Sequence, residues 1–322
     1  MVRIIALALI SFAPLAADAQ AQAQTWPNRP VRIVVPSPPG GGTDIIARVM
    51  ADNFSKVFKQ QFFVENRPGA GNMIGIESVA RAAPDGYTFL ITASTLSLNS
   101  VLYKKISYDP IKDFAPITIA ATAPNVLIIN PSIPAKNLKE FIALAKKEAG
   151  KMTYGTPGIG TSPHMSMELF KNMAGIDLQH IPYRGTAPAL TDVVSGQITA
   201  MFSNALTAKP QIAAGKVRAL GVTTAARSGT MPDIPSISEA GVTGYDAVQW
   251  YGFLAPAGTP PAILTRIHAE AMKALNAAEM KEKLASDGAE PAPSTPEAFA
   301  AHIRAEIEKW RKVAQAAGIE PQ

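Results

Sequence analysis

The sequence predicts an α/β fold built from open, mainly parallel sheets covered by helices. Short apolar runs alternate with patterns of helical spacing along most of the 322 residues. The chain is 47% apolar and 17% charged, a composition typical of folded globular proteins. Its length is sufficient for about two domains of ordinary size.

The predicted strands are short apolar runs that end at turn residues. Val31–Val35 is apolar apart from Arg32, which indicates a strand buried on both faces. Further strands are predicted in PDGYTFLITA, which ends at Ala93, in NVLIIN, LQHIPY, ITAMF and VRALGVT, and at the beginning of GFLAPAGTPPA.

The predicted helices carry apolar side chains spaced three and four residues apart, which gives each helix one buried face. A short helix is predicted near 77–82, and GFLAPAGTPPA opens another at its double proline. The longer apolar faces comprise Ile45, Ile46, Val49, Met50, Phe54, Val57 and Phe58, then Leu138, Phe141, Ile142 and Ala145, and finally Phe299, Ile303, Ile307, Trp310 and Val313.

The first 24 residues have the features of a secretory signal peptide. Arg3 precedes an apolar run at 4–15, which is shorter than the roughly 20 residues that a membrane-spanning helix needs. The small-residue motifs ADA (17–19) and AQA (21–23) are candidate cleavage sites. We predict that 1–24 directs export to the periplasm; the alternative is a buried N-terminal helix. Because the sequence has no cysteine, we expect no disulfide and no lipid anchor on cysteine.

The charge balance and the motifs favour a binding protein over an enzyme. The net charge of +5 is dispersed along the chain, which suits a small anionic ligand and argues against nucleic acid. The motifs G-x-S-x-G and H-E-x-x-H are absent from the sequence, as is a cysteine nucleophile. His164 and Glu168 have a spacing that suits a shared metal, but the sequence offers no third ligand beside them. We therefore expect no metal and no cofactor.

A glycine-rich turn follows the first strand and opens a helix. Backbone N–H groups of Gly40, Gly41 and Gly42 at such a turn form a favourable site for an anion, and Thr43 adds a hydroxyl. Asp44 is expected to stabilise the beginning of the helix. The turn has no following lysine, so it does not match a phosphate-binding P-loop. The alternative is a capped helix without a ligand.

The same arrangement of strand, polar turn and helix recurs along the chain. In 152–170, Thr161 or Ser162 is a candidate N-cap before a proline, and in 180–194 the candidate cap is Thr186. A fourth strand ends in the segment 94–97, at Ser94, Thr95 and Ser97. Several such turns in one α/β chain favour neutral donors that converge on an anion.

Three side chains near these turns have two interpretations each. Arg184 is suited to a carboxylate through two parallel hydrogen bonds, or it is a solvated surface arginine. Tyr183 lines the pocket or simply packs. His164, at a helix start, is either a neutral hydrogen-bond donor to the ligand or a capping and packing residue.

Many ordered motifs resemble one family. VRIVVPSPPGGGTDIIAR, VENRPGAGNMIG, PDGYTFL, YDPIKDFAPIT, YGTPGIGTSPHMSMELF, IPYRGTAPALTDVVSGQI, VRALGVTTAARS, DIPSISEAG and WYGFLAPAGTP occur in this order. The chain resembles the Bug proteins, also called the TctC family, which are extracytoplasmic solute receptors of tripartite tricarboxylate transporters. The resemblance spans the chain from Trp26 to the C-terminal helix.

This resemblance implies a two-lobed periplasmic-binding-protein fold of type II, with the ligand cleft between the lobes. It implies lobe 1 at 25–124 and 246–322 and lobe 2 at 125–245. It also implies that a ligand carboxylate is held between one loop of each lobe. The residues expected at the ligand are Ser37, Pro39, Gly40, Gly41, Gly42, Thr43, Asp44, Ser94, Thr95, Gly158, Gly160, Thr161, Ser162, His164, Tyr183, Arg184, Gly185, Thr186 and Ser203.

Two departures from the family pattern bear on the ligand. Ser203 stands where members often have Asp, and Leu96 stands where they often have His. Loss of a carboxylate disfavours an amino-acid ligand, and leucine suggests an apolar wall. We therefore expect a non-amino organic acid, an aliphatic or aromatic dicarboxylate, bound by a monomer that delivers it to permease subunits. The alternatives are a ligand-sensing subunit of a membrane signalling protein and an exported enzyme acting on a carboxylate.

Overall fold

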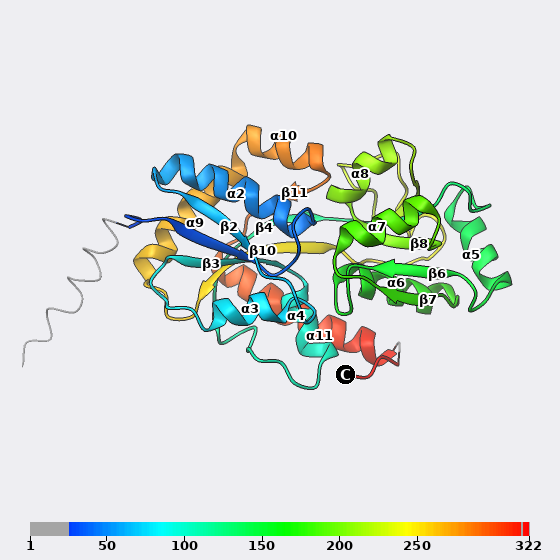
Figure 1. Cartoon of the computed structure of the whole chain (residues 1–322), viewed down its shortest axis with the longest axis horizontal. Coiled ribbons are helices and arrows are strands. Elements are labelled where there is room, and N and C mark those ends of the chain that lie inside the picture. The colour runs from blue at the N-terminus through cyan, green and yellow to red at the C-terminus, as the bar shows by residue number, and fades with distance from the viewer. Residues whose placement is uncertain (1–25, 317, 322) are drawn as a thin grey trace, which may run out of the picture.

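The computed structural model describes residues 26–316 and 318–321. The predicted signal peptide at 1–24 lies outside these residues. Two sheets organise the described chain, as Figure 1 shows, and their strands alternate with helices in the chain order that the sequence predicts. The predicted two-lobed α/β fold is confirmed.

In the first sheet, β1 lies between β3 and β2. Its strand order is β11-β4-β10-β3-β1-β2. β1 pairs in parallel with β2 and β3, whereas β10 pairs antiparallel with both β3 and β4. The strands are β1 (Val31–Val35), β2 (Phe62–Asn66), β3 (Thr88–Ala93), β4 (Phe114–Ala123), β10 (Gln249–Pro256) and β11 (Glu290–Pro291).

Helices cover both faces of this sheet, and every residue of the inner strands β3 and β10 is buried. One apolar cluster joins α2, α9 and α10 to one face, and a second joins α3, α4 and α11 to the other. Figure 1 shows these groups above and below the strands. The helices are α2 (Gly42–Phe58), α3 (Met73–Ala80), α4 (Thr95–Leu102), α9 (Pro261–Asn276), α10 (Ala278–Asp287) and α11 (Pro296–Ala316).

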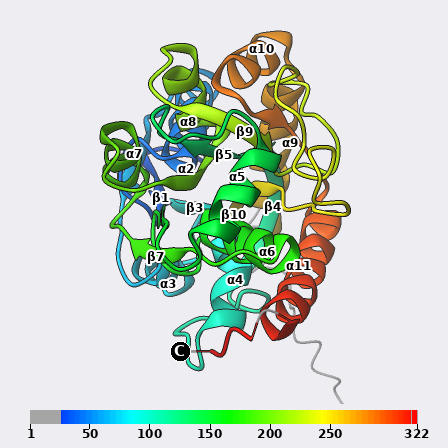
Figure 2. The same ribbon diagram turned by 90° about the vertical axis from the view of Figure 1, so that its right-hand side faces the viewer.

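The second sheet has the order β7-β6-β8-β5-β9. Figures 1 and 2 both place α7 and α8 on the opposite side of this sheet from α6, in agreement with the separate apolar clusters of the two sides. The elements are β5 (Asn125–Ile129), α5 (Leu138–Lys147), β6 (Thr153–Thr156), α6 (Ser162–Ala174), β7 (Gln179–Pro182), α7 (Thr186–Ser195), β8 (Ala200–Asn204), α8 (Ala205–Ala213) and β9 (Arg218–Val222). We call the first sheet with its helices lobe 1 and the second lobe 2.

The chain crosses between the sheets twice, and these crossings explain why the prediction of mainly parallel sheets is wrong. β4 ends at Ala123 and β5 begins at Asn125, and the chain returns into β10 at Gln249. Both sheets are mixed rather than mainly parallel, because β10 and β5 are antiparallel to both of their neighbours. Parallel neighbours arise from crossover connections within one sheet, and a strand that enters from the other lobe is free of that constraint.

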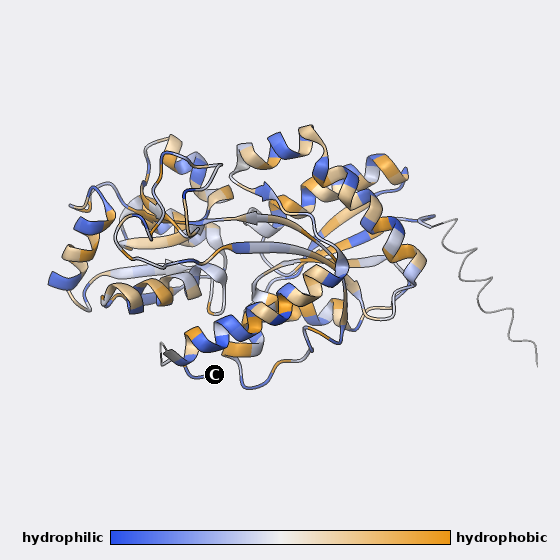
Figure 3. Cartoon of the chain, turned by 180° about the vertical axis from the view of Figure 1, so that it is seen from behind, coloured by the Kyte–Doolittle hydropathy of each residue, from blue (hydrophilic) through white to orange (hydrophobic). Residues whose placement is uncertain are grey.

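The predicted helix faces are largely buried. In α2, Ile46, Met50 and Phe54 are at most 1% exposed, whereas Val57 in the last turn is 46% exposed. In α11, the predicted positions from Phe299 to Trp310 are buried as well. Figure 3 shows the resulting alternation of hydrophobic and hydrophilic residues along α11.

One buried carboxylate joins α11 to the strand that returns from lobe 2. Oε2 of Glu306 accepts hydrogen bonds from the indole Nε1 of Trp250 on β10, at 3.2 Å, and of Trp310, at 2.9 Å. Glu306 is 6% exposed, and the two tryptophans are each 1% exposed. The neighbours of Trp250 on β10 include Gln249 and Tyr251, so this link fixes a strand that reaches the space between the lobes.

We predict that Glu306→Ala lowers the free energy of unfolding by about 3 kcal/mol, because two buried indole N–H groups lose their acceptor. Glu306→Gln retains an amide oxygen in the same place and should cost much less. Urea denaturation of the two variants measures the difference. Equal losses in Ala and Gln would contradict this role of the carboxylate oxygen.

Candidate functional site

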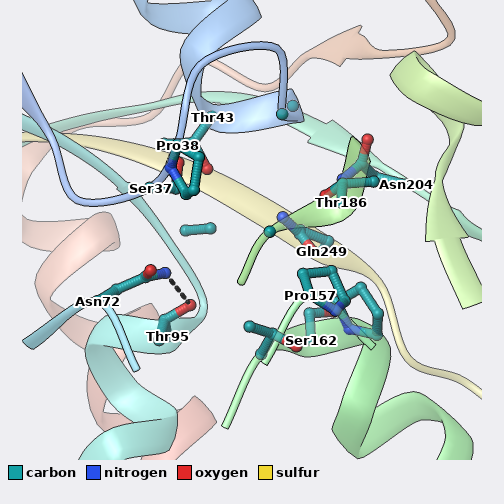
Figure 4. Close-up of a pocket in the computed structure, with 16 residues that line it drawn as sticks. Ser37, Pro38, Thr43, Asn72, Thr95, Pro157, Ser162, Thr186, Asn204 and Gln249 are labelled. Atoms are coloured by element: carbon teal, nitrogen blue, oxygen red, sulfur yellow. Dashed lines mark hydrogen bonds between the residues drawn. The ribbon is translucent and has the colours of Figure 1, made fainter. Parts of the chain in front are cut away.

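A pocket between the lobes is surrounded by the N-termini of six helices of the described chain. The pocket is lined by N-cap or first-turn residues of α2, α3 and α4 from lobe 1 and of α6, α7 and α8 from lobe 2. Each helix begins at or just beyond the carboxyl end of a strand or in the turn that follows one, so the fold brings these starts together. Figure 4 shows this inner pocket with its labelled residues. The representatives are Gly41, Asn72, Thr95, Thr161, Gly185 and Asn204.

The six helix starts share a second property: they lack side-chain caps. No N-cap side chain of these helices accepts a hydrogen bond from its own first turn. Away from the pocket, Asn137 at the start of α5 accepts from the backbone N–H of Glu140, whereas α9 and α10 also begin without a side-chain cap. Helix starts carry N–H groups that the helix itself leaves unpaired, together with a partial positive charge. Several of these groups around one pocket form a site for an anion.

The side chains at the pocket add neutral donors. Ser162 Oγ accepts from Nδ2 of Asn125 at 2.8 Å, which leaves the serine O–H to donate toward the pocket. Thr95 Oγ1 accepts from Nδ2 of Asn72 at 3.4 Å, with the same consequence (Figure 4). Among the residues that the structure places around the inner pocket, none carries a charged side chain.

The opening glycine loop is held from behind by Asp44. Its carboxylate accepts from the backbone N–H of Gly40 at 3.0 Å, from Nε of Arg48 at 2.9 Å and from Nδ2 of Asn66 at 3.0 Å. Burial raises the pKa of Asp44, but these hydrogen bonds outweigh it and hold the pKa below its usual value. Asn66 also donates to the carbonyl of Ser37. Asp44 therefore shapes the loop and does not line the pocket.

The loop before α6 rests on a stack of buried rings. The imidazole of His164 lies 4.5 Å from that of His180, which lies 4.8 Å from the ring of Tyr154. The backbone N–H of Gly160 donates to Nδ1 of His164 at 3.4 Å, so this histidine is an acceptor inside the loop. Burial, aided by the neighbouring His180, lowers the pKa of His164 to about 4. The packing interpretation of His164 fits this placement.

A wider chamber continues outward from the inner pocket. It has a volume of about 660 Å³ and shares Pro38, Asn72, Pro157, Thr161 and Gly185 with the inner pocket. We call it the outer chamber. Its remaining walls come from the turn before α3 and the end of α4 in lobe 1, and from the end of β7 and the loops after β6 and β7 in lobe 2.

The structure sorts the predicted site residues into three groups. Nine line the inner pocket: Ser37, Gly41, Gly42, Thr43, Thr95, Thr161, Ser162, Gly185 and Thr186. Gly158, Tyr183 and Arg184 line the outer chamber only. Pro39, Gly40, Asp44, Ser94, Gly160, His164 and Ser203 line neither cavity. A role in ligand binding stays a prediction for each of them.

Several of the residues in the last group support the pocket from outside. Ser94 Oγ lies 3.5 Å from the backbone N of Trp250, and Ser203 Oγ shares a hydrogen bond with Thr207. Tyr183, at the outer chamber, donates to Oδ2 of Asp192 at 2.6 Å. Burial and this hydrogen bond raise the pKa of Tyr183 to about 12, so its hydroxyl keeps its proton.

Sequence reasoning missed three polar residues of the inner pocket. Asn72 and Asn204 are the N-caps of α3 and α8, and the rule of strand end followed by helix start identifies Asn204 in AMFSNAL. Gln249 lies on β10, and its Oε1 is buried without a hydrogen-bond partner in the described chain. No local pattern marks Gln249, because it reaches the pocket from the strand that returns from lobe 2.

The metal interpretation of His164 and Glu168 finds no supporting cluster. Within the described residues, His, Cys, Asp and Glu side chains form no group of three that could hold a metal ion. Glu168 instead accepts from the hydroxyl of Tyr154 and from Nζ of Lys171. The described part of the chain also has no helix that is long and apolar enough to cross a membrane.

The buried imidazole predicts a specific dependence of stability on pH. The folded-state pKa of His164 lies below its unfolded value of 6.5, so the unfolded chain takes up this proton first. The free energy of unfolding therefore decreases as the pH falls from about 6.5 toward 4. When the pH is lowered from 7 to 4.5, the free energy of unfolding of His164→Gln should fall by about 2 kcal/mol less than that of the unaltered protein. Urea denaturation at the two pH values measures both changes. Parallel losses in the two proteins would show that His164 does not titrate below its usual range.

A family model and solved structures match this chain over most of its length. The model described as "Tripartite tricarboxylate transporter family receptor" (TctC) matches residues 46–319. The structure of Rpa4515 from R. palustris with adipate has 38% sequence identity and a TM-score of 0.90, covering 92% of this chain and 100% of that one.

Two further structures are similar over the same region. The periplasmic binding protein BugD has 35% identity and a TM-score of 0.88, covering 92% of this chain and 100% of that one. MatC from Rhodopseudomonas palustris with bound malate has 32% identity and a TM-score of 0.84, covering 89% and 99%. The family match, the two-lobed fold and the pocket of helix N-termini agree, and the chain belongs to the TctC family of tripartite tricarboxylate transporter receptors.

Proposed function

We propose that this protein is a periplasmic receptor that captures a small organic carboxylate between its lobes and delivers it to the membrane subunits of a tripartite tricarboxylate transporter. The observation that carries the proposal is the convergence of six uncapped helix N-termini on one pocket. Both the unpaired N–H groups and the helix dipoles favour a negative charge there. The solute-receptor family of the chain supports capture rather than chemical conversion.

A carboxylate suits this pocket better than a more highly charged anion. The lining side chains are neutral hydroxyls and amides, which match the single charge and two oxygens of a carboxylate. A phosphate ester carries more charge and is usually accompanied by Lys or Arg. Two relatives of the chain were solved with adipate and malate, which are both carboxylates without an ammonium group.

Ligand capture is expected to hold the lobes together. Gly185 of lobe 2 approaches Pro38 of lobe 1 so closely that a Cβ on the glycine would lie 3.0 Å from Pro38 Cγ. A Cβ on Gly160 of lobe 2 would lie 3.2 Å from Oδ1 of Asn99 in α4. A ligand that contacts helix starts of both lobes stabilises this closed arrangement through its higher affinity for it. The closed form then presents one surface to the membrane subunits.

Gly41 offers a test of the backbone donors. In the described chain its N–H has no hydrogen-bond partner, its φ of −83° is close to that of proline, and a Cβ there meets nothing nearer than 3.8 Å. Gly41→Pro should therefore fold and lower the affinity for adipate by about 10-fold or more, since one charge-assisted hydrogen bond is lost.

Gly41→Ala is the matched control, because it adds a Cβ and keeps the N–H. We expect its affinity for adipate in titration calorimetry to stay within about 3-fold of the unaltered protein. If Pro and Ala bind alike, the N–H of Gly41 makes no contact with the carboxylate.

The neutral lining also predicts discrimination against amino acids. No Asp or Glu lines either cavity of the described chain, so an α-ammonium group would be desolvated without a partner. Adipate and succinate should raise the melting temperature of the protein more than their amino counterparts, 2-aminoadipate and aspartate. Larger shifts with the amino acids would contradict the proposed ligand class.

A further inference from the structure

We propose that the outer chamber is a second anion subsite, in which Arg184 binds a carboxylate at the far end of the ligand. This inference rests on the proposed function, since it takes the inner pocket as the site of the first carboxylate. The receptor would then select solutes that carry two anionic groups separated by a short apolar body.

The sizes of the two cavities support a ligand that occupies both. The inner pocket has a volume of about 50 Å³, whereas one water needs roughly 10–15 Å³ on the same kind of measure. The inner pocket therefore has room for about four water-sized groups, which suits a carboxylate and the adjoining carbon better than the whole of a longer acid. The outer chamber, at about 660 Å³, lies within the usual range for ligand sites and is continuous with the inner pocket. The rest of the ligand extends into it.

Arg184 is the one charged residue that lines either cavity in the described chain. Its guanidinium has no hydrogen-bond or ion-pair partner among the described residues, whereas most other arginines of lobe 2 and lobe 1 are paired. The nearby carboxylate of Asp192 is occupied by the hydroxyl of Tyr183. A free guanidinium at the wall of a ligand chamber can hold a carboxylate through two parallel hydrogen bonds.

The backbone around Arg184 is fixed relative to the inner pocket. The N–H of Tyr183 donates to the carbonyl of Thr156 at 2.9 Å, and the N–H of Gly185 donates to the carbonyl of Pro157 at 2.9 Å. Gly185 and Pro157 both line the inner pocket as well. The distance between the two subsites is therefore set by a short, hydrogen-bonded segment rather than by a free loop.

Apolar groups from both lobes line the outer chamber as well. Ala70 and Tyr103 belong to lobe 1, and Ile159 and Pro182 belong to lobe 2. A Cβ on Gly71 of lobe 1 would lie 3.4 Å from the carbonyl oxygen of Ile159, so the lobes meet at this wall. Such walls fit the methylenes or ring of a dicarboxylate and offer no compensation for a charge placed midway.

The test compares acids that differ only in the second carboxylate, by titration calorimetry on the exported form of the chain. The pairs are succinate and butanoate, adipate and hexanoate, and terephthalate and 4-methylbenzoate. For at least one pair, the dicarboxylate should bind about 5-fold or more tightly than its partner, and the gain should shrink at high salt because Arg184 is exposed to solvent.

In Arg184→Gln, the ratio of dicarboxylate to monocarboxylate affinity should fall to about 1. Arg304→Gln on α11 is the matched control, because it removes an exposed arginine of the same charge remote from both cavities and should preserve the ratio.

The second subsite would be overturned by equal affinities within every pair, or by a gain that persists in Arg184→Gln. In either case, binding of the monocarboxylates would still support the proposed function. Failure of every acid to bind would overturn both.

Discussion

The first N–H groups of an α-helix have no hydrogen-bond partner within the helix. The site in this structure depends on six helices whose unpaired N–H groups surround one pocket. At α5 the chain satisfies one such group with the side chain of Asn137, whereas α9 and α10 also begin without a side-chain cap. Around the inner pocket it leaves them uncapped and facing the space between two lobes. The pocket is consequently electropositive without a charged side chain, and under the proposed function a bound carboxylate would supply the acceptors for these N–H groups.

The same constraint connects binding to closure. Three of the six helix starts belong to each lobe, so neither lobe alone completes the set of donors. The antiparallel pair β4 and β10 carries the two crossings between the sheets, and its register is interrupted between Tyr251 and Gly252 and between Phe253 and Leu254. Gln249, in the same strand, reaches the pocket floor with an unpaired amide oxygen. The beginning of β10 is thus both part of the crossing between the lobes and part of the pocket lining.

The sequence predicted the helix starts better than the side chains. Glycine, threonine and serine after an apolar run identified the starts of α2, α6 and α7 and the strand end before α4, because strand end, turn and helix start are all local signals. Gln249 gave no signal, because its place depends on the return of the chain from lobe 2. For His164 the sequence left two interpretations open, ligand donor and packing residue, because its stacking partner His180 lies on β7, away from it in the chain. Arg184 was expected near a carboxylate, and only the structure separates the outer chamber from the inner pocket.

The most direct measurement is a crystal structure of the exported protein with the acid from the matched pairs that binds most tightly. We expect a carboxylate in the inner pocket, with its oxygens about 3 Å from backbone nitrogens of helix starts in both lobes, such as Gly42 and Ser162. A ligand held entirely in the outer chamber, or bound to one lobe with the backbone N–H groups facing water, would contradict it.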